Sequence, residues 1–240
     1  MNYAVLNPYR EAVVAEFQFH NYLRVVTLGG KHAAHDAALW FAKTNHLTLA
    51  SIVQPPSSAA GTGFKEIVAL SKLPITYGDG VLVPSNTAVG IGSRDCPIVV
   101  LYNSYRPTTV VCHAGRPALS RGTAGEITVL NAAIDAVTNH DSSQRCYVRA
   151  YVTAGICADC LVHEGKGAET YLAPFRRYHP NAIGARGRLD LHKVIRCELE
   201  QLGVPNTNIV VDTTCTKEHS AMSSHRNGDA VNNIVLVLQH

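Results

Sequence analysis

Residues 92–115 read GSRDCPIVVLYNSYRPTTVVCHAG, in which two apolar runs flank a short polar turn. The β-branched composition of Ile98–Tyr102 and Thr108–His113 predicts two strands. If these strands form a hairpin, the residues just before the first strand lie beside those that end the second. We therefore expect the side chains of Cys96 and His113 to be neighbours.

A cysteine beside a histidine supports two different chemistries. The imidazole can act as the base for a thiol nucleophile, or the sulfur and the nitrogen can together bind a metal such as zinc. With Cys96 and His113 considered alone, an inert buried cysteine is the more common outcome. Other parts of the sequence are needed to choose between a thiol nucleophile, a metal site and an inert cysteine.

Short β-branched runs and amphipathic stretches alternate on both sides of this segment. Further strands are predicted at Val13–Phe19, Leu23–Leu28, Leu47–Val53, Gly80–Val83, Ala88–Ile91, Cys146–Thr153, Asn208–Asp212 and Asn233–Leu238. Helices are predicted at Thr123–Asn139, Ala168–Tyr178 and Leu189–Leu202, the first with Thr123 and Glu126 as a capping box. Because several strands are adjacent in sequence, we expect an α/β (α+β) fold with mixed β-sheets flanked by helices, in one domain over residues 1–240.

Composition excludes several classes of protein. Apolar residues make up 46% of the 240 residues and charged residues 16%, which predicts a packed core and excludes a disordered chain. A net charge of +3 is weaker than that of a dedicated nucleic-acid binder, and the basic stretch from Arg176 to Arg196 has no interleaved aromatic residue beyond Tyr178. We expect no nucleic-acid partner, whereas a small anionic substrate stays open.

The seven cysteines are odd in number and irregularly spaced, so we expect them to be reduced. Cys157 and Cys160 have the two-residue gap of redox and zinc motifs, but a second such pair is missing from the sequence, which favours a structural or site-lining role. Charged residues interrupt the first 17 residues, so they lack the apolar region of a signal peptide. No apolar run in the sequence is long enough to span a membrane. We therefore expect a cytoplasmic protein without a membrane partner.

Four short motifs occur in a fixed order: Asp95-Cys96-Pro97, His113-Ala114-Gly115, Cys215-Thr216 and Ser224-His225-Arg226. In this order and at these spacings the chain resembles the laccase-domain proteins, also described as multicopper polyphenol oxidoreductase-like proteins or peptidoglycan-editing factors. The resemblance covers roughly residues 78–240. It implies a laccase-domain-like fold of mixed sheets, a zinc ion held by two histidines and one cysteine, and purine nucleoside phosphorylase activity accompanied by adenosine deamination.

The resemblance also implies roles for individual residues. The catalytic residues would be Cys96, His113 and Asp95, with Cys96 and His113 also serving as zinc ligands. The substrate-binding residues would be Arg226, His225, Arg116 and Gln54, and the guanidinium of Arg226 is suited to holding phosphate.

The chain also departs from the family pattern. The family's first histidine ligand lies in a Gln-Val-His segment, where this chain has Gln54-Pro55-Pro56, so the third zinc ligand is missing or supplied elsewhere. Replacement candidates are His32, His35, His163 and His219. Arg116-Pro117-Ala118 stands where the family has Trp-Arg-Gly, and the Gly-Arg expected near Asp229 is missing. We expect an incomplete zinc site, and no copper because the histidines are scattered.

Three functions are compatible with these residues. The first is an enzyme acting on purine nucleosides or a related small polar substrate, with phosphate as a second substrate. The second is a metal-independent enzyme in which Cys96 is the nucleophile and His113 the base, for acyl transfer, hydrolysis or deamidation. The third is a binding protein that has lost catalysis, and the oligomeric state stays open for all three.

Overall fold

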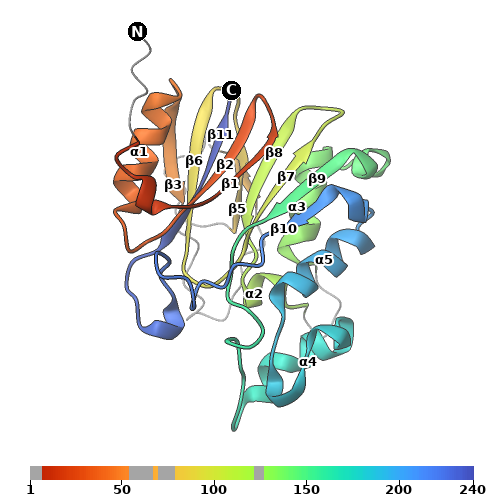
Figure 1. Cartoon of the computed structure of the whole chain (residues 1–240). Helices are drawn as coiled ribbons and strands as arrows, with labels where there is room; N and C mark the ends of the chain where they lie inside the picture. Colours follow the sequence, from red (N-terminus) through yellow and green to blue (C-terminus); the bar gives the residue numbers. More distant parts are fainter. Residues whose placement is uncertain (1–6, 54–66, 70–78, 122–126) are drawn as a thin grey trace.

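Two β-sheets lie face to face, and helices cover their outer sides (Figure 1). The computed structural model describes residues 7–53, 67–69, 79–121 and 127–240. The first sheet has the strand order β1-β2-β11-β6-β3, and the second has the order β10-β9-β7-β8-β5-β4. Both contain parallel and antiparallel pairs, which confirms the predicted mixed sheets.

The elements have the following bounds. The strands are β1 Val13–His20, β2 Leu23–Leu28, β3 Thr48–Val53, β4 Ile67–Ala69, β5 Gly80–Val83, β6 Thr87–Ser93, β7 Ile98–Asn103, β8 Thr108–His113, β9 Val148–Val152, β10 Ile209–Val211 and β11 Asn233–Gln239. The α-helices are α1 Ala34–Thr44, α2 Arg116–Leu119, α3 Val129–Thr138, α4 Ala168–Tyr178 and α5 Leu191–Gln201.

The apolar core has three layers: one between the helices and the second sheet, one between the two sheets, and one between the first sheet and α1. The second sheet is therefore buried on both faces. Along β7, Val99 and Leu101 pack against the helices, whereas Ile98 and Val100 pack between the two sheets. This alternation follows from the two-residue period of a strand, and burial of both faces explains why β7 is apolar throughout. The outer face of the first sheet packs against α1, which supplies the third layer.

The predicted strands and helices are present, with corrections at their ends. The helix predicted from Thr123 begins only at Val129 in α3, where the Asn131 side chain accepts the Thr128 N–H at 2.9 Å. Thr123 and Glu126, the predicted capping box, lie outside the described residues. The strand predicted from Cys146 begins at Val148, because residues 142–147 form a 3-10 helix.

Helix α1 was not predicted. Its buried face is made largely of alanines, namely Ala34, Ala37, Ala38 and Ala42, with Phe41 as the one large side chain. Such small residues give a weak apolar pattern, although they allow the helix to approach the first sheet closely.

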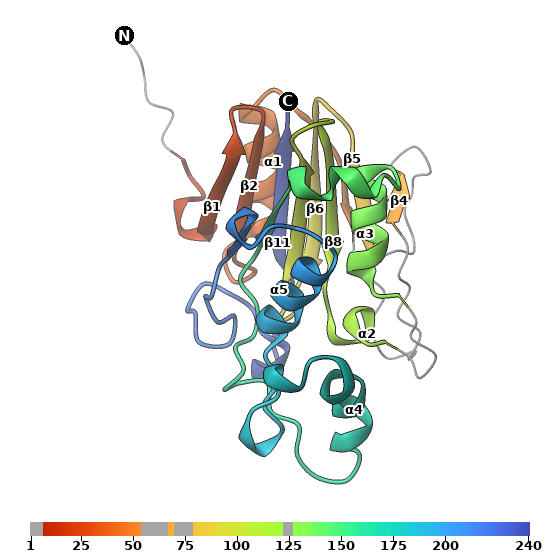
Figure 2. The same ribbon diagram turned by 90° about the vertical axis from the view of Figure 1, so that its right-hand side faces the viewer.

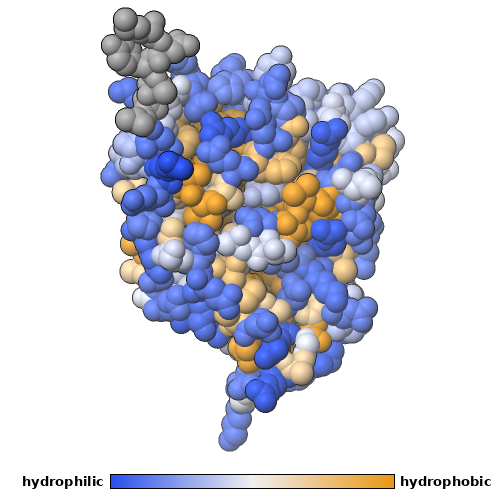
Figure 3. All heavy atoms as spheres, in the orientation of Figure 1, coloured by the Kyte–Doolittle hydropathy of each residue, from blue (hydrophilic) through white to orange (hydrophobic). Residues whose placement is uncertain are grey.

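The ends of several strands meet on one side of the molecule. In two views at right angles, α4 lies beyond the strand ends, below the sheets (Figures 1 and 2). The face seen in Figure 3 is largely hydrophilic, with apolar residues exposed in patches across its middle. None of the described helices has the length and apolar character needed to cross a bilayer.

Candidate functional site

The β7–β8 hairpin brings Cys96 and His113 together. The two strands pair antiparallel with Ile98 opposite His113, and the Ala114 N–H donates to the Pro97 carbonyl at 2.9 Å. The turn that precedes β7 therefore lies beside the residue that ends β8. Both side chains are partly exposed, so reagents can reach them from solvent.

Gly115 shows how closely the two side chains converge. A Cβ atom added to Gly115 would lie 3.1 Å from Cys96 Sγ, 3.1 Å from His113 Nε2 and 2.7 Å from His113 Cε1. The 2.7 Å contact is shorter than real Cβ atoms show, so a larger residue at this position would displace the imidazole. The sulfur and the imidazole thus face the same small volume above the start of α2.

Asp79 supports the other side of the imidazole. Its carboxylate is buried just before β5, with Oδ1 3.7 Å from His113 Nδ1, and the Asp79 carbonyl accepts the His113 N–H at 2.6 Å. No local pattern in the sequence points to Asp79. Only the pairing of β5 with β8 places it there.

The protonation of His113 reflects these neighbours. Burial lowers the pKa of His113, but the nearby Cys96 and Asp79 raise it more, to about 9. The imidazole is therefore a cation at neutral pH. It can donate a proton to a substrate and balance negative charge next to it.

Asp95 holds loops in place next to Cys96. Its Oδ1 accepts the Thr216 hydroxyl at 2.9 Å, and its Oδ2 accepts the Arg226 N–H at 3.2 Å. Its carbonyl accepts the Ile156 N–H at 2.8 Å. These contacts favour a positioning role for this carboxylate, whereas the catalytic role implied by the resemblance stays a prediction.

Two arginines lie near the Cys96–His113 pair. Arg116 is half-buried at the start of α2, and Arg226 is exposed in the loop before β11. Burial lowers the pKa of Arg116, and the charge of Arg226 lowers it further, whereas Tyr171 and Cys96 raise it. The two guanidiniums thus repel each other next to a sulfur, an arrangement that an anion would stabilise.

His163 and Tyr171 complete this side of the site. Arg116 lies 3.5 Å from His163 Nδ1 and stacks over the Tyr171 ring at 4.0 Å. Burial lowers the pKa of His163, and the charges of Arg116 and Arg226 add to the effect. A neutral His163 beside two cations is a donor or acceptor for a polar substrate. Tyr171 was not predicted as a site residue from the sequence.

The remaining predicted site residues are less informative. His225 is exposed on the same loop as Arg226. Gln54 lies outside the described residues.

The zinc ion implied by the resemblance can be tested against the donor atoms present. Among the described residues, only Cys96 and His113 offer ligands at this point, because no third histidine, cysteine or carboxylate forms a metal-binding group with them. Of the four replacement candidates, His32 and His35 are exposed, His219 accepts the Ala221 N–H, and His163 contacts Arg116. The donors described are therefore fewer than the three of a catalytic zinc site.

Cavities indicate where a substrate can lie. The hollow behind Cys96, lined by Arg94, Thr216 and Asn233 among others, measures about 10 Å³ and holds at most one water. A larger cavity of about 570 Å³ is lined by His20, Tyr22, Tyr102 and Gln239 at the other end of the β7–β8 hairpin, and none of the described site residues lines it. Neither of these two cavities offers room for a substrate beside Cys96.

The chain is similar in sequence to a known protein family and to a curated protein. The family model described as multi-copper polyphenol oxidoreductase laccase matches residues 20–234. A curated relative named adenosine deaminase RL5, from an unknown prokaryotic organism, is 26% identical over 147 residues, or 58% of this chain. The alignment spans about half of that relative, 52% of its length.

Solved structures share the fold at low sequence identity. Bacillus licheniformis hypothetical protein YfiH is 17% identical with a TM-score of 0.73, covering 91% of this chain and 93% of its own. Neisseria meningitidis protein NMB0706 is 18% identical with a TM-score of 0.66, covering 92% and 95%. YlmD from Geobacillus stearothermophilus is 14% identical with a TM-score of 0.61, covering 91% of each chain. These likenesses confirm the predicted fold.

Proposed function

This chain belongs to the multi-copper polyphenol oxidoreductase laccase family, and we propose that it is an enzyme that cleaves purine nucleosides with phosphate. The observation that carries this proposal is the position of two arginines beside the Cys96–His113 pair. Arg116 directly follows Gly115, which lies against both of those side chains, and the Arg226 backbone N–H donates to the Asp95 carboxylate at 3.2 Å. The name of the relative adenosine deaminase RL5 supports a nucleoside as the substrate class.

The arginines are suited to bind the attacking phosphate. A phosphate dianion between Arg116 and Arg226 would relieve their mutual repulsion and accept charge-assisted hydrogen bonds from both. One phosphate oxygen then forms a bond to C1′ of the ribose while the bond from C1′ to the purine nitrogen breaks. The electron pair of that bond leaves with the purine.

His113 is suited to protonate the leaving purine. Because its pKa lies at about 9, the imidazole carries a proton at neutral pH that it can give to a purine ring nitrogen. The products are the free base and ribose 1-phosphate, and His113 regains its proton from solvent. Asp79 holds the other face of the imidazole and stabilises the cation before transfer.

The test measures phosphate-dependent release of base from inosine and adenosine, with formation of inosine from adenosine followed separately. We expect hypoxanthine and ribose 1-phosphate in equal amounts, only when phosphate is present. His113→Gln should lower turnover by about 10²–10⁴-fold, the range for loss of a general acid. Release of base without phosphate, or no release at all, would contradict the proposal.

Arginine variants separate phosphate binding from other losses. Arg226→Ala should raise the KM for phosphate by about 10–100-fold, because a hydrogen bond to a charged group contributes about 1.5–3 kcal/mol. Arg177→Ala is the matched control, since Arg177 is exposed on α4 and stacks on Tyr178. Equal effects of the two substitutions would remove the phosphate role from Arg226.

A second candidate function is a thiol enzyme, and the Asp79–His113–Cys96 arrangement favours it. A carboxylate, an imidazole and a sulfur in sequence are the parts of a nucleophile activated by an oriented base. In this case Cys96 would attack an acyl or amidine carbon and form a covalent intermediate. Iodoacetamide should then label Cys96 faster in the wild type than in His113→Gln, whereas equal rates would count against this candidate.

A further inference from the structure

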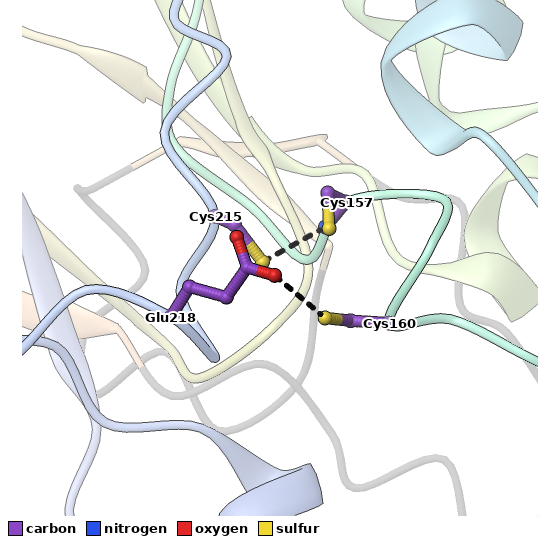
Figure 4. A group of neighbouring side chains, drawn as sticks. All are labelled: Cys157, Cys160, Cys215 and Glu218. Carbon is purple, nitrogen blue, oxygen red and sulfur yellow. Dashed lines mark hydrogen bonds between the residues drawn. The ribbon is translucent and has the colours of Figure 1, made fainter.

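Three sulfurs and a carboxylate meet in a second cluster, separate from Cys96 and His113. The Sγ atoms of Cys157, Cys160 and Cys215 and a carboxylate oxygen of Glu218 all lie within 4.8 Å of one another (Figure 4). In a tetrahedral zinc site with Zn–S bonds of about 2.3 Å, the ligand atoms are about 3.8 Å apart. A small inward movement of four side chains would therefore complete such a site.

The ligands come in two pairs, each on a tight turn. The Cys160 N–H donates to the Cys157 carbonyl at 3.1 Å, and the Glu218 N–H donates to the Cys215 carbonyl at 3.2 Å. Each turn thus presents two ligand atoms three positions apart in sequence. The first turn follows β9 and the second follows β10, and these strands are parallel neighbours, so their carboxyl ends bring the turns face to face.

The backbone around Cys215 is arranged for a thiolate. The Cys157 N–H donates to Cys215 Sγ at 3.4 Å. Donors of this kind stabilise the charged form that binds metals.

Cys160 has a partner inside the cluster. Its thiol donates to Glu218 Oε1 at 3.6 Å. A divalent cation binding here would displace thiol protons and balance the charge of the thiolates that it binds.

We propose that Cys157, Cys160, Cys215 and Glu218 bind one zinc ion, which joins the two turns that hold the Asp95–Pro97 segment. Sulfur-rich tetrahedral donor sets select zinc among the common divalent metals. Glu218 is exposed, so its carboxylate is the ligand open to exchange.

This ion would act on the candidate site through packing. The Gly155 backbone lies against Pro97, and the Ile156 N–H and the Thr216 hydroxyl both bond to Asp95. The turn that carries Cys96 is therefore contacted from two sides, by residues 155–160 and by residues 214–218. A metal joining them would fix that turn without touching the substrate.

The test is metal analysis of protein produced with zinc and kept reduced. We expect about one zinc per chain, which Cys215→Ser should abolish and the double variant Cys96→Ser/His113→Gln should retain. Cys146→Ser is the matched control, because Cys146 is an exposed cysteine outside the cluster. Zinc lost in the double variant but kept in Cys215→Ser would place the ion at Cys96 and overturn the proposal.

Three further measurements cover the case in which Cys215→Ser fails to fold. X-ray absorption of the zinc-loaded wild type should give about three sulfur and one oxygen neighbours, and Glu218→Gln should weaken zinc affinity by about 10-fold or more. Cobalt in place of zinc should give thiolate-to-metal absorption. An oxygen- and nitrogen-dominated shell, or a disulfide within the cluster after reducing purification, would contradict the site. All three measurements are independent of nucleoside turnover.

Discussion

Gly115 lies so close to His113 that a Cβ atom would come within 2.7 Å of the imidazole Cε1 and 3.1 Å of Cys96 Sγ. Gly115→Ala should therefore push the thiol and the imidazole apart. A displacement of about 1 Å can cost about 100-fold in rate, while overpacking costs about 1–3 kcal/mol of stability.

Gly184→Ala is the matched control, because its Cβ would meet nothing nearer than 3.6 Å. Turnover and the urea midpoint would be measured for both variants. We expect the Gly115 variant to lose activity out of proportion to its stability. Equal behaviour of the two variants would show that the close approach at Gly115 has no functional role.

The pKa of His113, at about 9 against an ordinary 6.5, predicts a pH-dependent stability. A raised pKa means that the folded state binds the proton more tightly than the unfolded state. The contribution is complete below about pH 6.5, declines between pH 6.5 and 9, and is absent above that range. Urea unfolding of chelator-treated protein at several pH values should show a steeper decline for the wild type than for His113→Gln. Parallel curves would contradict the raised pKa.

Asp79→Asn should lower the pKa of His113, because the Asp79 carboxylate, 3.7 Å from Nδ1, raises it. Titration of the His113 ring proton by NMR measures this directly. The pH at which nucleoside cleavage declines should move in the same direction. A merely structural role for Asp79 would change stability and leave the titration where it was.

Tyr171 is expected to hold the Arg116 guanidinium in place by stacking at 4.0 Å. A cation–π contact at a partly exposed site contributes about 0.5–1 kcal/mol, so Tyr171→Ala should raise the KM for phosphate by about 2–5-fold. Tyr171→Phe keeps the ring and should behave as the wild type. A rise for both variants would assign the effect to the hydroxyl.

Glu198 is buried in α5 and accepts hydrogen bonds from Arg121 at 3.2 Å, His179 at 3.1 Å and Thr128 at 2.6 Å. Removing it leaves the buried His179 and the partly exposed Arg121 without their shared hydrogen-bond acceptor. Glu198→Ala should lower the free energy of unfolding by about 3–5 kcal/mol. Glu200→Ala, at an exposed position of the same helix, should change it by less than about 0.5 kcal/mol. Urea unfolding measures both, and similar values would contradict the role given to Glu198.

The β7–β8 hairpin could be predicted from the sequence because Ile98–Tyr102 is apolar at every position and Thr108–His113 is rich in β-branched residues. That pattern belongs to strands buried on two faces, and it was enough to bring Cys96 beside His113. Asp79 could not be found in this way. Its contact with His113 depends on the pairing of β5 with β8, which no local pattern specifies.

The cysteine cluster was predictable only in half. Cys157 and Cys160 form a recognisable pair, but Cys215 and Glu218 mix two residue types and matched no metal motif. Their relation to the first pair depends on the parallel pairing of β9 and β10, which have 56 residues between them. A search for any two ligand residues three positions apart would have found the second pair.

Strand β11, residues 233–239, lies in the middle of its sheet with β2 on one side and β6 on the other. The β1–β2 ribbon, made more than 200 residues earlier in synthesis, reaches the rest of that sheet only through this strand. The sheet therefore cannot close until the ribosome has delivered residues 233–239. Until that moment β2 and β6 each have an open edge where a neighbouring chain can add, which makes the nascent protein a natural client for chaperones.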